Sequence, residues 1–249
     1  MTQSGRHWST APQQYSLDAA EIHAWRATLD AGSARVDRLA QALSQDEQAR
    51  AARFYFERDR RRFVVARGLL RTMLGSYLQL PPAALRFVYN EYGKPALAPE
   101  HDSALQFSLA HSGDRALFAF VHGAEIGVDL ESIRTDFDFT QLAEQFFSPQ
   151  EWAQLHTMPA HLQRAAFFHC WTRKEAYIKA RGQGLSLPLT SFSVTLRPDE
   201  PPRIEDASNG TGVAPRWTLY DLAPENGYAG ALAVRGEGWS LRCWQWSRA

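Results

Sequence analysis

The sequence predicts an α+β fold built on mainly antiparallel sheets. The first observation is the order of elements, because a helical pattern precedes a group of strands and the same order then returns. The second is the alternation of apolar and polar residues at Ile126, Val128 and Leu130, which is typical of a strand. Short glycine-containing turns, such as the one at Gly123, favour antiparallel neighbours.

Two helices are predicted in the first half. Ser44 is a candidate N-cap and Glu47 follows three residues later, which is the spacing of a capping box. A longer helix is predicted over residues 60–80, where apolar side chains recur at spacings of three and four. Pro81-Pro82 is expected to end this helix.

A group of strands is predicted around this long helix. The candidate strands cover residues 21–29, 85–89, 105–109, 116–121 and 126–131. Residues 110–114, which include His111, are predicted to form a polar loop between two of them. The pattern as a whole is that of a β-meander.

The second half repeats the order of helix and strand. Ser148 and Pro149 indicate a helix start, and a long helix is predicted over residues 165–180. Three closing strands are predicted over residues 217–220, 229–234 and 239–246, with loops over residues 198–202 and 206–212. This repeated order of helix and strands fits two similar halves, residues 1–123 and 124–249. Unrelated hairpins can resemble each other just as closely.

Composition and charge narrow the class of protein. The 249 residues are 45% hydrophobic, which is enough for a sizeable core. Lys plus Arg and Asp plus Glu both number 27, so no net field attracts nucleic acid or an anionic membrane. Two cysteines, Cys170 and Cys243, make no disulfide framework. Because the start is polar and no apolar stretch approaches a membrane span, we expect a cytoplasmic protein.

Two carboxylates share one face of the strand predicted over residues 126–131. Ile126, Val128 and Leu130 are expected to face the core, so Asp129 and Glu131 point together to the other side, about 6.5–7 Å apart along the strand. Magnesium prefers such oxygen ligands and leaves room for a phosphate. Gly127 on that face is expected to leave space for a ligand. Taken alone, the pair is better explained as a solvated acidic strand face, because strand ends often carry Asp and Glu.

A second set of polar residues lies on the helix of the second half. Trp171, Glu175 and Lys179 are spaced four residues apart and therefore share one helix face. Next to an aromatic side chain, Glu175 has a raised basicity or completes a metal site, and Lys179 meets a phosphate. Taken alone, an ordinary surface pair of Glu175 and Lys179 is the simpler interpretation.

Basic residues crowd one stretch of this neutral chain. They are Arg50, Arg53, Arg58, Arg60, Arg61, Arg62, Arg67 and Arg71. Arginine forks bind phosphate oxygens in pairs, so a pocket for a small polyphosphate is predicted, with a solvated helix face as the alternative. His111 is a further candidate donor to a phosphate, or an ordinary surface residue in a turn.

Together these segments resemble the 4'-phosphopantetheinyl transferases of the Sfp (surfactin-synthetase-activating) type. The matching segments are residues 54–59, 66–71, 92–95, 107–113, 127–131, 146–151 and 171–180. They stand in the family's order and cover roughly residues 40–195. Gly-Val-Asp-Leu-Glu at residues 127–131 and Trp-x-x-Lys-Glu-Ala-x-x-Lys at residues 171–179 are the most specific in combination.

The resemblance implies a pseudo-twofold α+β monomer of two similar α/β halves, with coenzyme A as co-substrate in the cleft between them. It implies transfer of the 4'-phosphopantetheine arm to a serine of an acyl or peptidyl carrier protein, giving holo-carrier protein and 3',5'-ADP. It also implies a magnesium ion held by Asp129, Glu131 and Glu175, with Lys179 near the pyrophosphate. Either Glu175 or a water molecule on the metal would take the serine proton.

The resemblance also implies a set of coenzyme A contacts. His111 would contact a phosphate, Arg58 and Lys94 would hold the 3'-phospho-ADP portion, and Ser108 and Tyr89 lie in matching binding segments. One departure is Ala110, where family members often have a serine, so a hydroxyl contact is lost.

Two other functions fit the same residues without the resemblance. One is a metal-dependent phosphohydrolase or nuclease, since acidic pairs with a lysine also build such sites. The other is a module that binds carrier proteins without catalysis. The neutral charge disfavours a nuclease, and the intact acidic trio disfavours a silent module.

Overall fold

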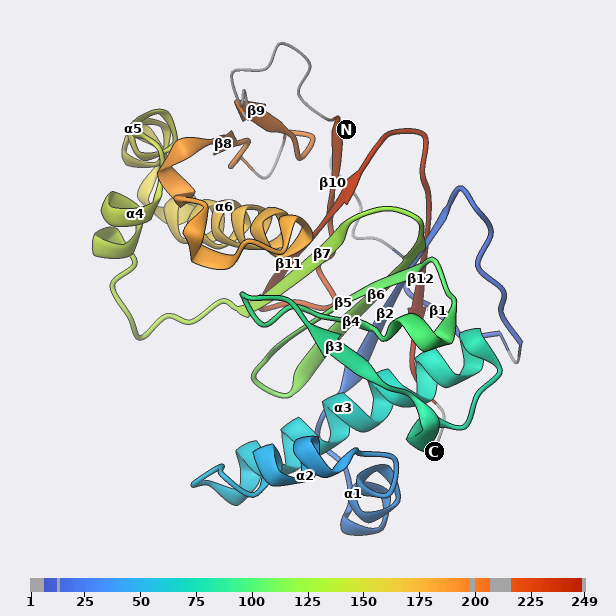
Figure 1. Cartoon of the computed structure of the whole chain (residues 1–249). Coiled ribbons are helices and arrows are strands. Elements are labelled where there is room, and N and C mark those ends of the chain that lie inside the picture. Colours follow the sequence, from blue (N-terminus) through green and yellow to red (C-terminus); the bar gives the residue numbers. More distant parts are fainter. Residues whose placement is uncertain (1–6, 13, 198–199, 207–215, 248–249) are drawn as a thin grey trace.

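Two β-sheets, each covered by one long helix, organise the chain (Figure 1). The structure is a computed structural model and describes residues 7–12, 14–197, 200–206 and 216–247. The α+β class with mainly antiparallel pairing, predicted from the order of elements, is confirmed.

The larger sheet has five strands in the order β1-β12-β2-β6-β5. Its strands are β1 (Ser9–Thr10), β12 (Ser240–Gln245), β2 (Glu21–Thr28), β6 (Arg115–His122) and β5 (Leu105–Ser112). β12 runs parallel to β1 and β2, and the other pairs are antiparallel. β12, which comes late in the sequence, therefore lies in the same sheet as β1 and β2, which come first.

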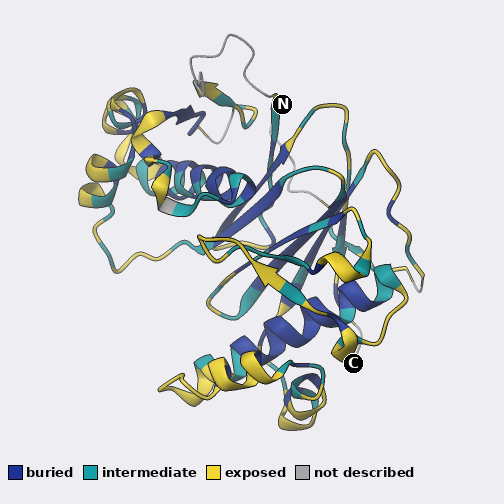
Figure 2. Ribbon diagram, in the orientation of Figure 1, coloured by how far each residue is buried: buried dark blue, intermediate teal, exposed yellow. Residues whose placement is uncertain are grey.

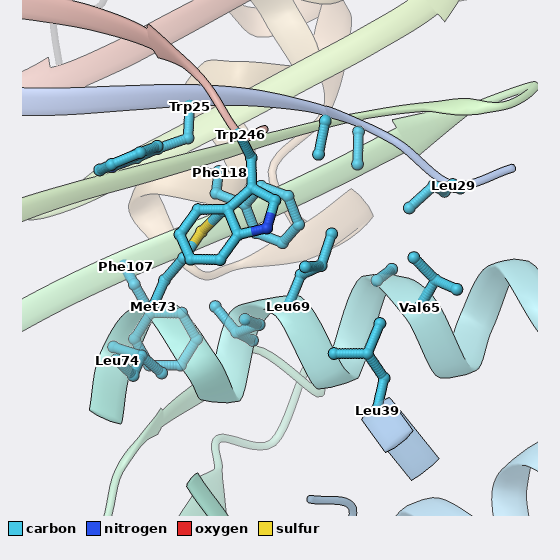
Figure 3. Close-up of a cluster of buried hydrophobic side chains, with 14 of the residues drawn as sticks. Trp25, Leu29, Leu39, Val65, Leu69, Met73, Leu74, Phe107, Phe118 and Trp246 are labelled. Atoms are coloured by element: carbon cyan, nitrogen blue, oxygen red, sulfur yellow. The ribbon is translucent and has the colours of Figure 1, made fainter. Parts of the chain in front are cut away.

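Three helices of the first half lie beside this sheet. They are α1 (Ser33–Ala40), α2 (Gln45–Ala51) and α3 (Glu57–Leu78). α3 packs its apolar face on the sheet, where Leu69 and Met73 meet Trp25, Phe118 and Trp246 (Figure 3). Burial of such large side chains is the main source of stability in this layer.

The smaller sheet has three antiparallel strands in the order β10-β11-β7. They are β10 (Trp217–Asp221), β11 (Tyr228–Arg235) and β7 (Ile126–Ser132). Helix α6 (Ala160–Arg181) lies across β7 and β11, and α4 (Thr140–Phe146) and α5 (Pro149–Thr157) surround its first half (Figure 1). Small residues on β11, Ala229, Ala231 and Ala233, let the helix lie close to the sheet.

The two sheets pack face to face at a third core. Leu117 and Ala119 of the larger sheet meet Val128, Leu130 and Leu232 of the smaller one. The layers therefore run from α3 through the two sheets to α6, and the strands are buried in the middle (Figure 2). This arrangement buries β7 on both faces, which decides the geometry of the candidate site.

Short elements complete the fold. A hairpin is formed by β3 (Phe87–Tyr89) and β4 (Pro95–Leu97), and a second pair by β8 (Ser193–Val194) and β9 (Ile204–Asp206). Single 3₁₀ turns are η1 (Pro82–Ala84), η2 (Pro99–His101), η3 (Gly184–Ser186) and η4 (Leu189–Ser191). No helix among the described residues is both long and apolar enough to cross a membrane.

Most predicted elements are confirmed within a few residues. The capping box at Ser44 and Glu47 starts α2, and Ser148 caps α5. α3 and α6 begin three and five residues earlier than the predicted starts at residues 60 and 165. Of the predicted loops, residues 198–199 and 207–212 lie outside the described residues. The division at residue 123 stays a prediction.

The predicted loop at residues 110–114 is wrong for most of its length. β5 continues through Ala110, His111 and Ser112, and only Gly113 and Asp114 form the turn to β6. Gly113 has φ +58°, a left-handed conformation that favours glycine. Polar residues usually indicate a loop, but two of these, His111 and Ser112, belong to the end of β5 beside the candidate site.

Candidate active site

Strand β7 presents its two carboxylates to helix α6. Ile126, Val128 and Leu130 face the core between the sheets, as the alternation predicts. Asp129 and Glu131 therefore face the opposite side, which α6 covers. Asp129 is buried at 4% exposure and Glu131 is half-buried, so the alternative of a solvated acidic face is wrong.

Gly127 permits the close approach of helix and strand. A Cβ atom added there would lie 2.1 Å from the carbonyl oxygen of Ala176 and 2.2 Å from the amide nitrogen of Ala180. The expectation that Gly127 leaves space for a ligand is therefore wrong, because the backbone of α6 fills that space. The contact brings the last turns of α6 against the acidic residues of β7.

Helix α6 turns its half-buried stripe toward this strand. Trp171, Glu175 and Lys179 are all half-buried, which matches one helix face at a spacing of four. The face is set by two fully buried cations on the other side. Arg173 pairs with Asp221, and Lys174 donates to Glu151 and to the carbonyl oxygen of Phe192 at 2.6 Å. Lys174, the first lysine of the motif at residues 171–179, therefore has a structural role, whereas Lys179, the second, reaches the site.

Lys179 pairs with the strand and not with its helical neighbour. Its Nζ donates to Oδ1 of Asp129 at 2.5 Å. The other carboxylate oxygen of Asp129, Oδ2, is buried and receives no hydrogen bond from any residue that the structure describes. The alternative of a plain surface pair with Glu175 is therefore wrong, and an acceptor is left open in the site.

Burial and neighbouring charge raise the pKa of two carboxyl groups, those of Glu131 and Glu175. Burial and the charge of Asp129 raise the pKa of Glu175 to about 7. The same two causes raise the pKa of Glu131, although a hydrogen bond from Ser112 opposes them. Burial lowers the pKa of Lys179, but the hydrogen bond to Asp129 and the charges of Asp129, Glu175 and Glu131 together outweigh it, so the net shift is upward. Three carboxylates therefore share one small region with one ammonium group.

The donor chemistry of this region suits a hard divalent cation. Carboxylate oxygens are the ligands that magnesium prefers, and Oδ2 of Asp129 is a buried acceptor in need of a partner. The side chains are nonetheless not gathered around one point. Within the described ranges, no group of three or more His, Cys, Asp and Glu residues is arranged to hold a metal ion. Lys179 instead neutralises Asp129.

His111 and Arg62 lie on the same side as Lys179, and of these two only Arg62 adds a positive charge. His111 lies near the exposed end of β5, and its pKa is lowered by the surrounding protein and by the charges of Lys179 and Arg62. Arg62 belongs to the basic stretch, but nothing in the sequence singles it out. It lies near the start of α3, and its charge contributes to the lowered pKa of His111.

A cavity of about 300 Å³ opens beside Lys179. Tyr89, Lys94 and Ser108, three of the predicted coenzyme A contacts, line it. Lys94 is already engaged, because its Nζ donates to the carbonyl oxygens of Ile126 and Ala180 at 3.1 and 2.9 Å. Burial lowers the pKa of Lys94 to about 8.

A second cavity, of about 720 Å³, adjoins the first and shares Arg50, Arg67 and Tyr89 with it. Arg50 lines both cavities, a role that its place in a run of arginines does not reveal. The structure does not bring Arg58 to either cavity lining. Its side chain is 70% exposed and pairs with Asp59.

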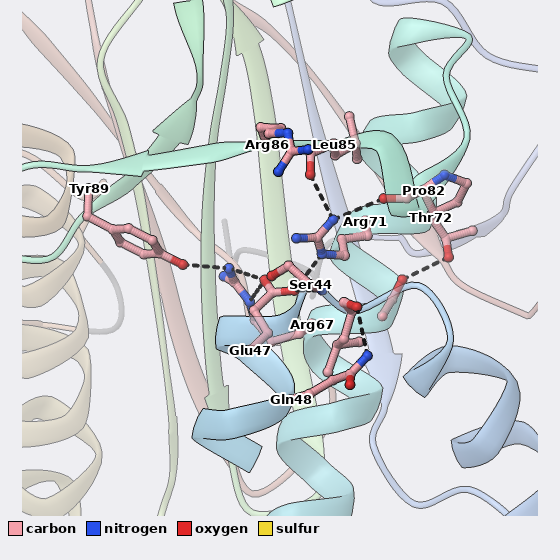
Figure 4. Close-up of polar contacts among 12 residues, drawn as sticks. Ser44, Glu47, Gln48, Arg67, Arg71, Thr72, Pro82, Leu85, Arg86 and Tyr89 are labelled. Atoms are coloured by element: carbon pink, nitrogen blue, oxygen red, sulfur yellow. Dashed lines mark hydrogen bonds and ion pairs between the residues drawn. The ribbon is translucent and has the colours of Figure 1, made fainter. Parts of the chain in front are cut away.

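Part of the basic stretch is structural. Arg67 and Arg71 enclose the buried carboxylate of Glu47, with the Nε atom of Arg67 2.8 Å from Oε1 (Figure 4). Arg71 also donates to two backbone carbonyl oxygens, and Arg67 to the hydroxyl of Tyr89 at 3.1 Å. The interpretation of the whole stretch as a phosphate pocket is therefore too broad.

Comparison with known proteins identifies the class. A model of the 4'-phosphopantetheinyl transferase superfamily matches residues 125–233, and a model of the N-terminal part of 4'-phosphopantetheinyl transferases matches residues 24–122. The 4'-phosphopantetheinyl transferase HetI of Nostoc sp. is 40% identical over 240 residues, 96% of this chain and 98% of that protein. The chain therefore belongs to the 4'-phosphopantetheinyl transferase superfamily.

Relatives of the Sfp type narrow the class. The 4'-phosphopantetheinyl transferase Sfp of Bacillus subtilis is 35% identical over 169 residues, which are 68% of this chain and 73% of Sfp. The resemblance to the Sfp type is confirmed, and the chain is a transferase of phosphopantetheine to carrier proteins. A solved holo-[acyl-carrier-protein] synthase from Neisseria meningitidis covers 45% of this chain at 19% identity and a TM-score of 0.35, which supports no further conclusion.

Proposed function

We propose that the chain performs this transfer with Asp129, Glu131 and Glu175 as oxygen ligands of a magnesium ion. The observation that carries the proposal is the buried Oδ2 of Asp129, which has no partner in the part of the chain that the structure describes, beside two carboxylates with raised pKa values. Such an excess of acid is unfavourable in a protein interior unless a cation joins it. The ammonium group of Lys179, now on Oδ1 of Asp129, leaves one acceptor for that cation.

When bound, the ion supplies positive charge to the phosphate oxygens as charge develops on them. In the reaction, the serine hydroxyl oxygen of the carrier protein attacks the phosphorus that bears the pantetheine arm. The bond from that phosphorus to the bridging oxygen breaks, and 3',5'-ADP leaves with the electron pair. We assign Lys179 to stabilise the leaving oxygen, and Glu175 or a water molecule to accept the serine proton.

Coenzyme A is proposed to lie along the adjoining cavities. Lys179 and Lys94 line the smaller one, Arg62 adds positive charge beside Lys179, and the neutral imidazole of His111 can donate a hydrogen bond to a phosphate oxygen. We keep Ser108 and Tyr89 as contacts, since both line the same cavity. Arg58 needs a change of side-chain position to take part, because it now points to solvent and to Asp59.

The acceptor is proposed to be an acyl or peptidyl carrier protein in the cytoplasm, served by a monomer. The two halves, residues 1–123 and 124–249, are proposed to contribute coenzyme A contacts and the metal ligands respectively. The assignment agrees with the location of Lys94 and His111 before β7 and of Glu175 after it.

Mass spectrometry of apo carrier protein with coenzyme A and magnesium tests the proposal. We expect the carrier to gain one phosphopantetheine and the gain to disappear when magnesium is chelated. Transfer that persists in full under chelation contradicts the metal proposal. Release of phosphate from nucleic acid would favour a hydrolase, and binding of coenzyme A without turnover would favour a silent module.

A further inference from the structure

The two sheets meet where one edge strand lies beside another. β5 is the last strand of the five-stranded sheet, and β7 is the last strand of the three-stranded sheet. The two strands lie side by side, although they belong to different sheets. Edge strands carry backbone N–H groups that need partners, and a buried group without one is costly.

Two serines of β5 supply partners for these N–H groups. The hydroxyl of Ser108 accepts from the backbone N–H of Val128 at 3.0 Å, and that of Ser112 accepts from the N–H of Ser132 at 3.0 Å. The serines are four residues apart in β5, and so are their partners in β7. Side-chain hydroxyls therefore join the sheets at two matched points, which we call the serine seam (Ser108 and Ser112).

The serine seam encloses the acidic residues of the strand. Asp129 and Glu131 lie between the two bonded positions of β7, so their backbone is fixed at both sides. Ser112 also donates its hydroxyl hydrogen to Oε2 of Glu131 at 3.0 Å. One hydroxyl thus holds the strand through its oxygen and the carboxylate through its hydrogen.

The remaining place on this face of β5 is Ala110. Alternation along the strand directs it to the same side as Ser108 and Ser112, and it is buried at 5% exposure. It contributes no hydroxyl, so the connection between the strands depends on the two serines. The sequence marked this position as a departure, but the structure shows that it lies within the strand and not in a loop.

We propose that Ser108 and Ser112 are positioning residues that set the place of Asp129 and Glu131, with Ser112 fixing the orientation of the Glu131 carboxylate. The inference rests on the proposed metal site, because it concerns how its ligands are held. Groups that hydrogen-bond to metal ligands typically change metal affinity or activity by about 10–100-fold when removed. Ser112 contacts Glu131 directly and carries the larger expected effect.

The first test is amide hydrogen exchange, which needs neither metal nor substrate. We expect Ser112→Ala to speed exchange of the Ser132 amide about fivefold, while the Val128 amide is unchanged. Ser108→Ala is expected to do the reverse. Ser112→Thr keeps the hydroxyl and the protection. Ser103→Ala is the matched control, because the Ser103 hydroxyl accepts from the Leu105 N–H at the start of the same strand without touching β7.

The second test is calorimetric titration of manganese, in place of magnesium, into the same proteins with coenzyme A present. Ser112→Ala is expected to raise the Kd about tenfold, and Ser112→Thr and Ser103→Ala to leave it within twofold. Unchanged exchange at Ser132 in Ser112→Ala overturns the seam. Faster exchange with an unchanged Kd overturns the positioning role. A wild-type protein that binds no manganese, yet shows the expected exchange, overturns the metal proposal and the positioning role while the seam stands.

Discussion

Two groups of buried or half-buried charges, one beside α3 and one between β7 and α6, are balanced in opposite ways. In the first half, the one carboxylate of Glu47 meets the two guanidinium groups of Arg67 and Arg71 (Figure 4). In the candidate site, the carboxylates of Asp129, Glu131 and Glu175 share the single ammonium of Lys179.

The difference shows how a structural charge is distinguished from a functional one. Both oxygens of Glu47 receive hydrogen bonds, and Arg71 has further partners on the backbone, so this group is complete as it stands. Asp129 keeps one buried oxygen without a partner among the described residues. An incomplete group of acids in the interior persists when a ligand completes it, which is why we assign it to catalysis.

The largest expected effect on stability comes from the complete group. Glu47→Ala leaves two guanidinium groups buried without their counter-charge, so we expect the free energy of unfolding to fall by about 3–5 kcal/mol. Urea titration of the variant measures it. Glu237→Ala is the control, since it breaks an exposed pair with Arg216 and is expected to change the stability little. Equal losses in the two variants would contradict the structural role of Glu47.

The carboxylates of the candidate site are expected to respond in the opposite way, with a small change in stability and a large loss of activity. Asp129→Ala removes one of several acids that repel one another, so the free energy of unfolding should change little. Transfer of phosphopantetheine should fall at least about 100-fold, because charge stabilisation at the phosphate is lost. Mass spectrometry of the carrier protein measures the rate. Transfer at the wild-type rate would remove Asp129 from the site.

Gly127 tests whether the contact of helix and strand assembles the acids. Gly127→Ala forces the backbone of α6 away from β7, which we expect to cost about 1–3 kcal/mol of stability. Because Glu175 and Lys179 move with the helix, transfer should fall as well. Urea titration and the carrier assay on one preparation separate the two effects. A stable variant with full activity would show that the close approach is unnecessary.

The smallest effect concerns the charge of Glu175. Its ordinary pKa of 4.5 is raised to about 7 in the folded chain, so the folded state binds the extra proton between these values. Stability without metal should therefore fall as the pH rises from about 4.5 to about 7. In Glu175→Gln this part of the loss is absent.

Thermal unfolding in chelator, compared at pH 5 and pH 8, measures this difference. The two proteins should be about equally stable at pH 5, and the variant should be the more stable at pH 8. A wild type that gains on the variant as the pH rises would contradict the raised pKa.

Local signals predict much of this fold, since they act within a few residues. The capping box at Ser44, the N-cap at Ser148 and the alternation along β7 all appear as predicted. The acids of β7 were recognised from alternation, and Glu175 and Lys179 from helical spacing. Spacing along the sequence does not predict which distant residue each of these side chains contacts in the folded chain.

The misses all arise from contacts between distant segments. Gly127 was expected to make room for a ligand, yet it makes room for α6, which follows 30 or more residues later in the chain. Arg67 and Arg71 look like free phosphate binders until Glu47 is placed between them. Ser112 drew no attention as a residue of a turn, and only the position of β7 gives it a role.

The central claim is that three carboxylates from β7 and α6 bind one divalent ion together with coenzyme A. Electron paramagnetic resonance of free manganese measures this directly, in the presence of coenzyme A, with coenzyme A alone as the background. We predict one ion bound per chain in the wild type and none above background in the triple variant Asp129→Asn, Glu131→Gln, Glu175→Gln. Equal binding by a folded triple variant would contradict the claim.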